Sequence, residues 1–105
     1  MSNISDGQKL LVSYNVRPSE GRAYYEFVLG RYIPALQALG LEVSEAWHTA
    51  YGNYPNRLIG FVSHDEATMI KVLNDENWDA LNEQLGEYVT EFSYKVIPYQ
   101  LGFQF

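Results

Sequence analysis

The chain has 105 residues, of which 47% are hydrophobic and 15% aromatic, and its formal net charge is −6. This composition suits one domain with a real hydrophobic core and excludes a disordered chain. The seven Lys and Arg residues are scattered along the chain, which argues against binding to nucleic acid or to an anionic membrane surface.

The sequence contains no cysteine, so disulfides, thiol catalysis and thiolate metal sites are excluded. Residues 1–9, MSNISDGQK, lack the apolar segment of a signal peptide, and no apolar run approaches the roughly 18–20 residues that a membrane span needs. These features predict a cytoplasmic protein, folded as a single domain over residues 1–105 with a loose polar segment at 1–8.

A strand followed by a helix is predicted for the first part of the chain. Residues 9–17, KLLVSYNVR, are rich in β-forming side chains and precede a proline. Helical spacing at three- and four-residue steps then follows, and Gly40 supplies a C-terminal stop. Pro34 lies inside this helix, where it removes one backbone hydrogen bond and crowds the carbonyl of Gly30, so a bend or two helical pieces are expected. The apolar positions of the helix are Tyr25, Val28, Leu29, Tyr32, Leu36 and Leu39.

A hairpin and a second helical region are predicted next. Residues 41–52 and 56–64 have the composition of strands, and the residues between them are turn formers. Asp65 is expected to cap a helical region, in which residues 74–75, Asn-Asp, offer a second cap. The apolar positions of this region are Ile70, Leu73, Trp78, Leu81, Leu85, Val89 and Phe92.

The last segment, residues 93–105, is extended, and Pro98 bars it from forming a regular central strand throughout. The resulting order is β-α-β-β-α-β. With right-handed crossovers, this order predicts the ferredoxin-like α+β fold, in which one four-stranded antiparallel sheet carries both helices on one face.

Two strands carry apolar residues on both of their faces. Residues 10–12, LLV, and 58–62, LIGFV, lack the alternation expected of a sheet with one solvated face. Since the helices cover only one face, a partner chain is expected to cover the other. This predicts a homodimer with two-fold symmetry, packed sheet against sheet. The apolar C-terminal tail is expected either to reach the partner or to extend the fourth strand.

Three segments carry a resemblance to a known superfamily: residues 17–27, RPSEGRAYYEF, residues 33–61, IPALQALGLEVSEAWHTAYGNYPNRLIGF, and residues 73–85, LNDENWDALNEQL. A Pro followed by a Gly opens the first helix, and a Pro within that helix precedes Leu-Gly and the second strand. A Trp-x-Thr-x-x-Gly stretch then leads into the hairpin. This spacing resembles the dimeric α+β-barrel superfamily and, within it, NIPSNAP-like domains.

The resemblance implies a dimer of ferredoxin-like units, each with a pocket between sheet and helices. Relatives include antibiotic monooxygenases, haem-degrading enzymes, polyketide cyclases and muconolactone isomerases, and the fold does not select among them. One branch carries out cofactor-free oxygenation, often with an Asn on the first strand, a Trp and a His. Asn15 occupies such a first-strand position, whereas Trp47, His48 and His64 do not have the spacing of that branch.

His48 is the candidate catalytic residue. Strand alternation places it on one face with Ser44, Ala46 and Ala50, and places Trp47 on the other. Small neighbours leave room around the imidazole, and a histidine there is suited to act as a general base. The alternative is a half-buried histidine that bonds a neighbour.

Five residues are candidates for ligand binding: Tyr14, Asn15, Arg22, Tyr51 and His64. The two tyrosines would donate to a carbonyl or phenolate oxygen, or else form walls of the core. Arg22 lies at the start of the first helix, where an anion would also meet the helix N-terminus, but surface arginines are common. His64 is placed to bind haem in some relatives, or to lie solvated beside a helix cap.

Two functions stay open from the sequence. The first is a dimeric protein without a diagnosable reaction that binds a small hydrophobic or aromatic molecule between sheet and helices. The second is a cofactor-independent enzyme of monooxygenase, cyclase or isomerase type, in which His48 and tyrosines carry out acid–base chemistry. No cofactor is expected, and two histidines far apart in sequence do not form a spaced metal-ligand set.

Overall fold

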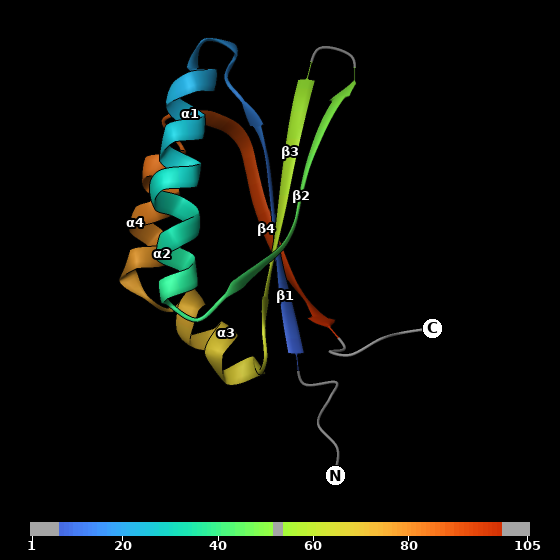
Figure 1. Cartoon of the computed structure of the whole chain (residues 1–105), viewed down its shortest axis with the longest axis vertical. Helices are drawn as coiled ribbons and strands as arrows, with labels where there is room; N and C mark the ends of the chain where they lie inside the picture. Colours follow the sequence, from blue (N-terminus) through green and yellow to red (C-terminus); the bar gives the residue numbers. More distant parts are fainter. Residues whose placement is uncertain (1–6, 52–53, 100–105) are drawn as a thin grey trace.

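The structure, a computed structural model, describes residues 7–51 and 54–99 (Figure 1). Its strands are β1 (Gly7–Val16), β2 (Glu42–Tyr51), β3 (Tyr54–Ser63) and β4 (Val89–Tyr99). Its helical segments are the 3-10 turn η2 (Pro18–Glu20), α1 (Gly21–Phe27), the π-turn η3 (Val28–Tyr32), α2 (Ile33–Ala38), α3 (Glu66–Leu73) and α4 (Glu76–Leu85).

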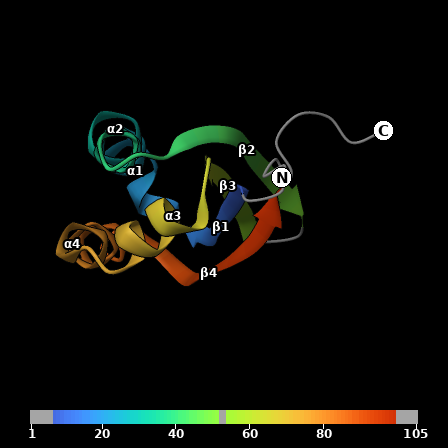
Figure 2. The same cartoon turned by 90° about the horizontal axis from the view of Figure 1, so that it is seen from below.

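The four strands form one antiparallel sheet in the order β2-β3-β1-β4. The helices lie together on one face of this sheet (Figure 2). No described element covers the opposite face, which we call the open face. The predicted ferredoxin-like α+β arrangement is therefore confirmed. No helix within the described ranges is long and apolar enough to cross a membrane.

Alternation along the strands divides the sheet into a buried and an open face. Every second residue of β1 from Leu10 to Val16 is buried against the helices, and Ile59 and Phe61 of β3 join them. The intervening residues of β1 face the open side and are only half-buried. The helices complete the core with Tyr24, Val28, Tyr32, Leu36, Met69, Val72, Trp78, Leu81 and Leu85.

Pro34 acts on the first helix by widening one turn. A bend or two helical pieces were expected, but α1, η3 and α2 follow one another without a break (Figure 1). Pro34 has no N–H to donate to the carbonyl of Gly30. In η3 the N–H of Ile33 donates instead to the carbonyl of Val28, five residues back. The chain thus absorbs the proline as a π-turn, and the helix continues.

The second helical region ends earlier than its periodicity predicts. The two expected caps are confirmed, since Asp65 accepts from the N–H of Thr68 at 2.7 Å and Asp75 from that of Asn77 at 2.8 Å. The Thr68 bond holds the pKa of Asp65 below its usual range.

The placement of Val89 and Phe92 in that helix was wrong. The N–H of Tyr88 donates to the carbonyl of Leu85 at 2.9 Å, and the carbonyl of Tyr88 accepts from Arg17 at 2.9 Å. These bonds turn the chain into the sheet, so Val89 begins β4. Spacing alone missed the boundary because alternate residues of β4 also face the core.

Three tyrosines are buried beneath the helices. Tyr14 and Tyr24 share a hydrogen bond of 2.7 Å between their hydroxyl oxygens, and their rings meet edge to face with centroids 5.7 Å apart. Tyr32 donates to Oδ1 of Asn82 at 2.7 Å. Burial raises the pKa of all three hydroxyls above the usual value, and the proximity of Tyr24 raises those of Tyr14 and Tyr32 further. These hydroxyls are therefore neutral throughout the physiological pH range.

The buried tyrosines predict a loss of stability in alkali. The unfolded chain releases tyrosine protons near pH 10, whereas the folded chain retains those of Tyr14, Tyr24 and Tyr32. Stability from this source is complete below about pH 10 and falls as the pH rises towards the raised folded values. We expect urea melts to show this fall, and phenolate absorbance of the folded protein to lag behind that of the unfolded protein.

Replacing Tyr14 by Phe is the matched control for this prediction. It removes one retained proton, so the dependence of the unfolding free energy on pH should become shallower above pH 10. The prediction would be wrong if all tyrosines of the folded chain titrated together near their ordinary value.

Candidate functional site

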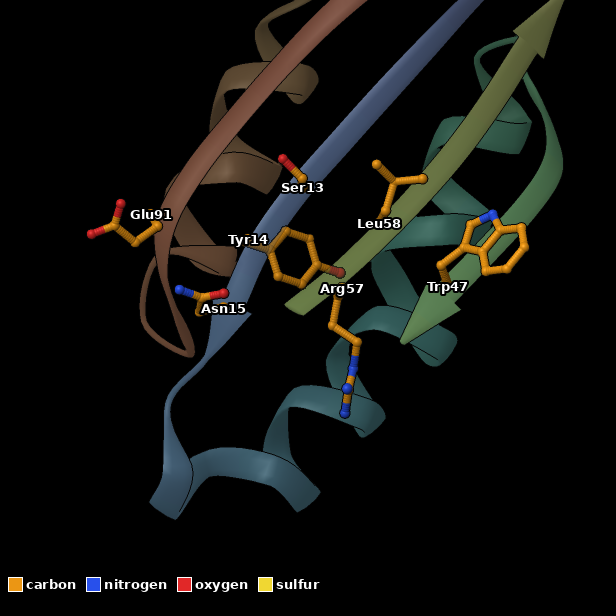
Figure 3. A pocket seen from close by; sticks show the side chains of 7 residues that line it. All are labelled: Ser13, Tyr14, Asn15, Trp47, Arg57, Leu58 and Glu91. Carbon is orange, nitrogen blue, oxygen red and sulfur yellow. The ribbon is translucent and has the colours of Figure 1, made fainter. Parts of the chain in front are cut away.

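Two hollows lie on either side of the sheet towards the β2–β3 hairpin. The first, which we call the strand–helix groove, has a volume of about 150 Å³. The second lies on the open face and has a volume of about 480 Å³. The groove is lined by Tyr24, Tyr25, Val28, Leu29, Ile33, Ala46, Trp47, His48, Arg57 and Ile59. The open-face hollow is lined by Ser13, Tyr14, Asn15, Trp47, Arg57, Leu58 and Glu91 (Figure 3).

Arg57 lines both hollows. Figure 3 shows it extending from β3, with Trp47 on β2 to one side and with Asn15 on β1 and Glu91 on β4 to the other. Its position follows from strand alternation, because Arg57 shares the helix-facing side of β3 with Ile59. A charged residue thus occupies a place that the fold would otherwise give to an apolar one.

The guanidinium of Arg57 packs against two tyrosine rings. Its Cζ lies 5.6 Å from the ring centroid of Tyr24 and 5.5 Å from that of Tyr25, both within range of a cation–π interaction. Nη2 donates to the hydroxyl of Tyr25 at 3.3 Å. Nε and Nη1 are buried and have no acceptor among the described residues. Arginine side chains stay charged at physiological pH, so the site holds a cation whose N–H groups are only partly satisfied.

The Tyr14–Tyr24 pair supports this cation from below. The hydroxyl of Tyr24 faces two opposing influences on its pKa. Burial raises the pKa, while the hydrogen bond from Tyr14 and the charge of Arg57 lower it, and burial prevails. The pair therefore remains neutral and supplies no negative charge to balance the guanidinium.

A second unsatisfied group lines the open-face hollow. Oδ1 of Asn15 is buried without a hydrogen-bond partner among the described residues. Across from it, Glu91 has a φ of 57°, a backbone conformation that residues other than glycine rarely adopt. The pairing of β1 with β4 shifts register between Ser13 and Asn15, next to Glu91. A bulge in the edge strand thus places a carboxylate beside the hollow.

The structure brings together only some of the residues that the sequence singled out. His48 is exposed, lines the groove and pairs with Arg57 in the β2–β3 register. Tyr14 and Asn15 line the open-face hollow. Arg22 is exposed beside Glu26, at 3.9 Å, and His64 lies 3.7 Å from Glu42, and neither lines a hollow.

The side chain of Tyr51, the remaining candidate, lies outside the described residues. Trp47 pairs with Leu58 and His48 with Arg57, so neighbouring residues of β2 face opposite sides of the sheet as alternation predicts. Because β2 is an edge strand, Trp47 nevertheless borders both hollows.

Sequence reasoning missed Arg57, Tyr24 and Tyr25. Residues 56–64 were treated as an apolar strand, and Arg57 was counted only among the scattered basic residues. The signal was present, since Arg57 lies two residues before Ile59 and four before Phe61, on the face that should be buried. The two tyrosines gave no such signal, because their contact with Arg57 depends on how α1 packs on the sheet.

Comparisons with known proteins show likeness in fold only. No protein-family model matches the sequence, and no curated protein matches it. A NIPSNAP family protein from Agrobacterium tumefaciens has a solved structure with 18% identity and a TM-score of 0.60, covering 87% of this chain and 90% of that one. A NIPSNAP-like domain protein from Burkholderia xenovorans has 15% identity and a TM-score of 0.64, covering 95% and 91%.

A third similar structure carries a named activity. It is a variant of SnoaB, a cofactor-independent oxygenase from Streptomyces nogalater, with 10% identity and a TM-score of 0.66, covering 92% of this chain and 96% of that one. The chain therefore has the α+β fold that NIPSNAP family structures and this oxygenase share, which confirms the predicted resemblance at the level of the fold.

Proposed function

We propose that the chain binds a small hydrophobic or aromatic molecule in the strand–helix groove. The observation that carries this proposal is the clustering of exposed apolar side chains there. Tyr25, Leu29 and Trp47 line the groove and are 49%, 63% and 60% exposed. Apolar side chains that remain exposed together mark binding surfaces more often than those scattered singly.

The dimensions of the groove indicate the size of the ligand. A hollow of about 150 Å³ holds a single aromatic ring. The π-turn η3 contributes Val28 and Leu29 to its wall, and such turns occur frequently at functional sites. The groove therefore fits a one-ring molecule lying between β2 and the first helical segment.

Benzyl alcohol is a neutral one-ring probe of this function. We expect saturable shifts in amide NMR signals of groove residues such as Ala46 and Ile59. Leu29→Gln should weaken binding about fivefold, because it removes roughly 1 kcal/mol of apolar contact. Ile70→Gln is the matched control, since Ile70 is equally apolar, 51% exposed and outside the groove. Absence of saturable shifts at groove amides in the unaltered protein would contradict the proposal.

A cofactor-independent enzyme is the second candidate function, and the position of His48 favours it. His48 lies in the groove and is paired in register with Arg57. An imidazole there is placed to take a proton from a bound phenol, and a neighbouring guanidinium would stabilise the oxyanion that forms. The activity named for the SnoaB structure, which shares the fold, supports this candidate.

Oxygen uptake with hydroquinone tests the enzymatic candidate. The phenol would lose two protons and two electrons to O₂, giving benzoquinone and hydrogen peroxide. If His48 is the general base, His48→Gln should slow uptake about a hundredfold. His64→Gln, the matched change at an exposed histidine outside the groove, should leave the rate unchanged. Uptake no faster than in buffer, or an unchanged rate in the His48 variant, would rule this candidate out.

The open face supports a further proposal, that the chain is a homodimer packed sheet against sheet. Leu11, Leu58 and Val62 lie on this face and are half-buried, with Trp47 at its edge. The charged pair on the same face is already neutralised, because Nζ of Lys9 contacts Oε1 of Glu45 at 2.6 Å. A mostly apolar face whose charges are paired suits burial against a second copy.

Sedimentation equilibrium at micromolar concentration tests the dimer. We expect twice the chain mass of 12.1 kDa. Val62→Lys should give monomers, because it would bury an unpaired charge beside Lys9 in the interface. Ile70→Lys, the same change on α3 away from the open face, should leave the dimer intact. A protein that sediments at the mass of one chain would show this proposal to be wrong.

A further inference from the structure

We propose that Arg57 is a receptor for a carboxylate, and that the one-ring ligand of the groove carries that group. This inference rests on the binding function proposed above and adds the chemical class of the ligand. It makes Arg57 the residue that sets specificity between an aromatic acid and its neutral analogue.

The unsatisfied hydrogen-bonding capacity of Arg57 is the first argument. Nη2 has one acceptor, the hydroxyl of Tyr25, while Nε and Nη1 are buried and have none among the described residues. Burying a charged donor without an acceptor is costly. A carboxylate on either edge of the planar guanidinium would satisfy at least one of these N–H groups, with the strength of a charge-assisted bond.

The missing counter-charge is the second argument. Arg57 forms no ion pair with any described carboxylate, although two other cations do, since Lys9 pairs with Glu45 and Arg22 with Glu26. The hydroxyls of Tyr14 and Tyr24 stay protonated because burial raises their pKa. The field of the guanidinium is therefore left for a bound anion to neutralise.

The walls of the site favour a planar, singly charged group. Tyr24 and Tyr25 present ring faces to the guanidinium, so a flat carboxylate attached to an aromatic ring matches the available surfaces. Arg57 is the only cation that lines the groove among the described residues. One cation in a chain with a net charge of −6 suits a monoanion better than a phosphate dianion.

Tyr25 gives the ligand a way in. Its ring is half-exposed, and its bond to Nη2, at 3.3 Å, is longer than typical hydrogen bonds. A ring held by one long bond on an exposed face can swing aside at little cost. The carboxylate would then take the place of the tyrosine hydroxyl at the guanidinium, while the aromatic ring occupies the groove.

Benzoate and benzyl alcohol form a matched pair of probes, because they share the ring and differ in charge. Amide NMR titrations should show benzoate binding the unaltered protein about tenfold more tightly than benzyl alcohol. Arg57→Met should abolish this preference and leave benzyl alcohol affinity nearly unchanged. Arg22→Met, which removes an exposed arginine outside the groove, should keep the preference.

Added salt provides a readout that does not depend on any variant folding. Benzoate binding should weaken as the salt concentration rises, while benzyl alcohol binding should not. Equal affinity for both probes, or a preference that survives Arg57→Met, would overturn the role of Arg57 and leave the binding function standing. Failure of both probes to shift groove amides would overturn the binding function, and this inference with it.

Discussion

The guanidinium of Arg57, buried against two tyrosine rings with two nitrogens lacking acceptors, is the constraint that connects this fold to a function. Each unsatisfied buried donor costs on the order of 1–3 kcal/mol, against a typical total stability of about 5–15 kcal/mol for a domain. An apolar residue at this position would remove that cost, since Ile59 and Phe61 continue the same face. A charge kept at such a cost is understandable where it meets an external partner.

The coverage of the sheet determines what surrounds that charge. Helices lie on one face only, so the strand–helix groove and the open-face hollow are separated by the sheet itself. Trp47 and Arg57 border both hollows because they lie towards the edge formed by β2. In the proposed homodimer, a second sheet would close over the open-face hollow and change the surroundings of both residues. Ligand binding in the groove and association of the sheets would then share two side chains, which is the minimum that coupling between them requires.

Topology was predictable because it follows from local patterns, whereas the site was not. The order of strands and helices, the caps at Asp65 and Asp75, and the opposite faces of Trp47 and His48 all follow from spacing within a few residues. Phe92 was misplaced because helical and strand periods briefly coincide where a helix runs into an edge strand. Arg57 was missed because its meaning is tertiary. An arginine two residues before Ile59 reads as the polar start of a strand until α1 brings Tyr24 and Tyr25 over it.

The shape of the groove has a local cause that connects sequence to site. Pro34 cannot donate to the carbonyl of Gly30, so the preceding turn widens into η3. A π-turn adds a residue to one turn of helix and so rotates the side chains before it relative to those after it. Val28 and Leu29 lie in that turn and Ile33 follows it, and all three line the groove. Leu29, left 63% exposed opposite Trp47 and His48, is an apolar side chain that the core does not use. The proline thus shapes the apolar wall, while strand alternation supplies the cation, and a ring bearing a carboxylate is the simplest molecule that complements both.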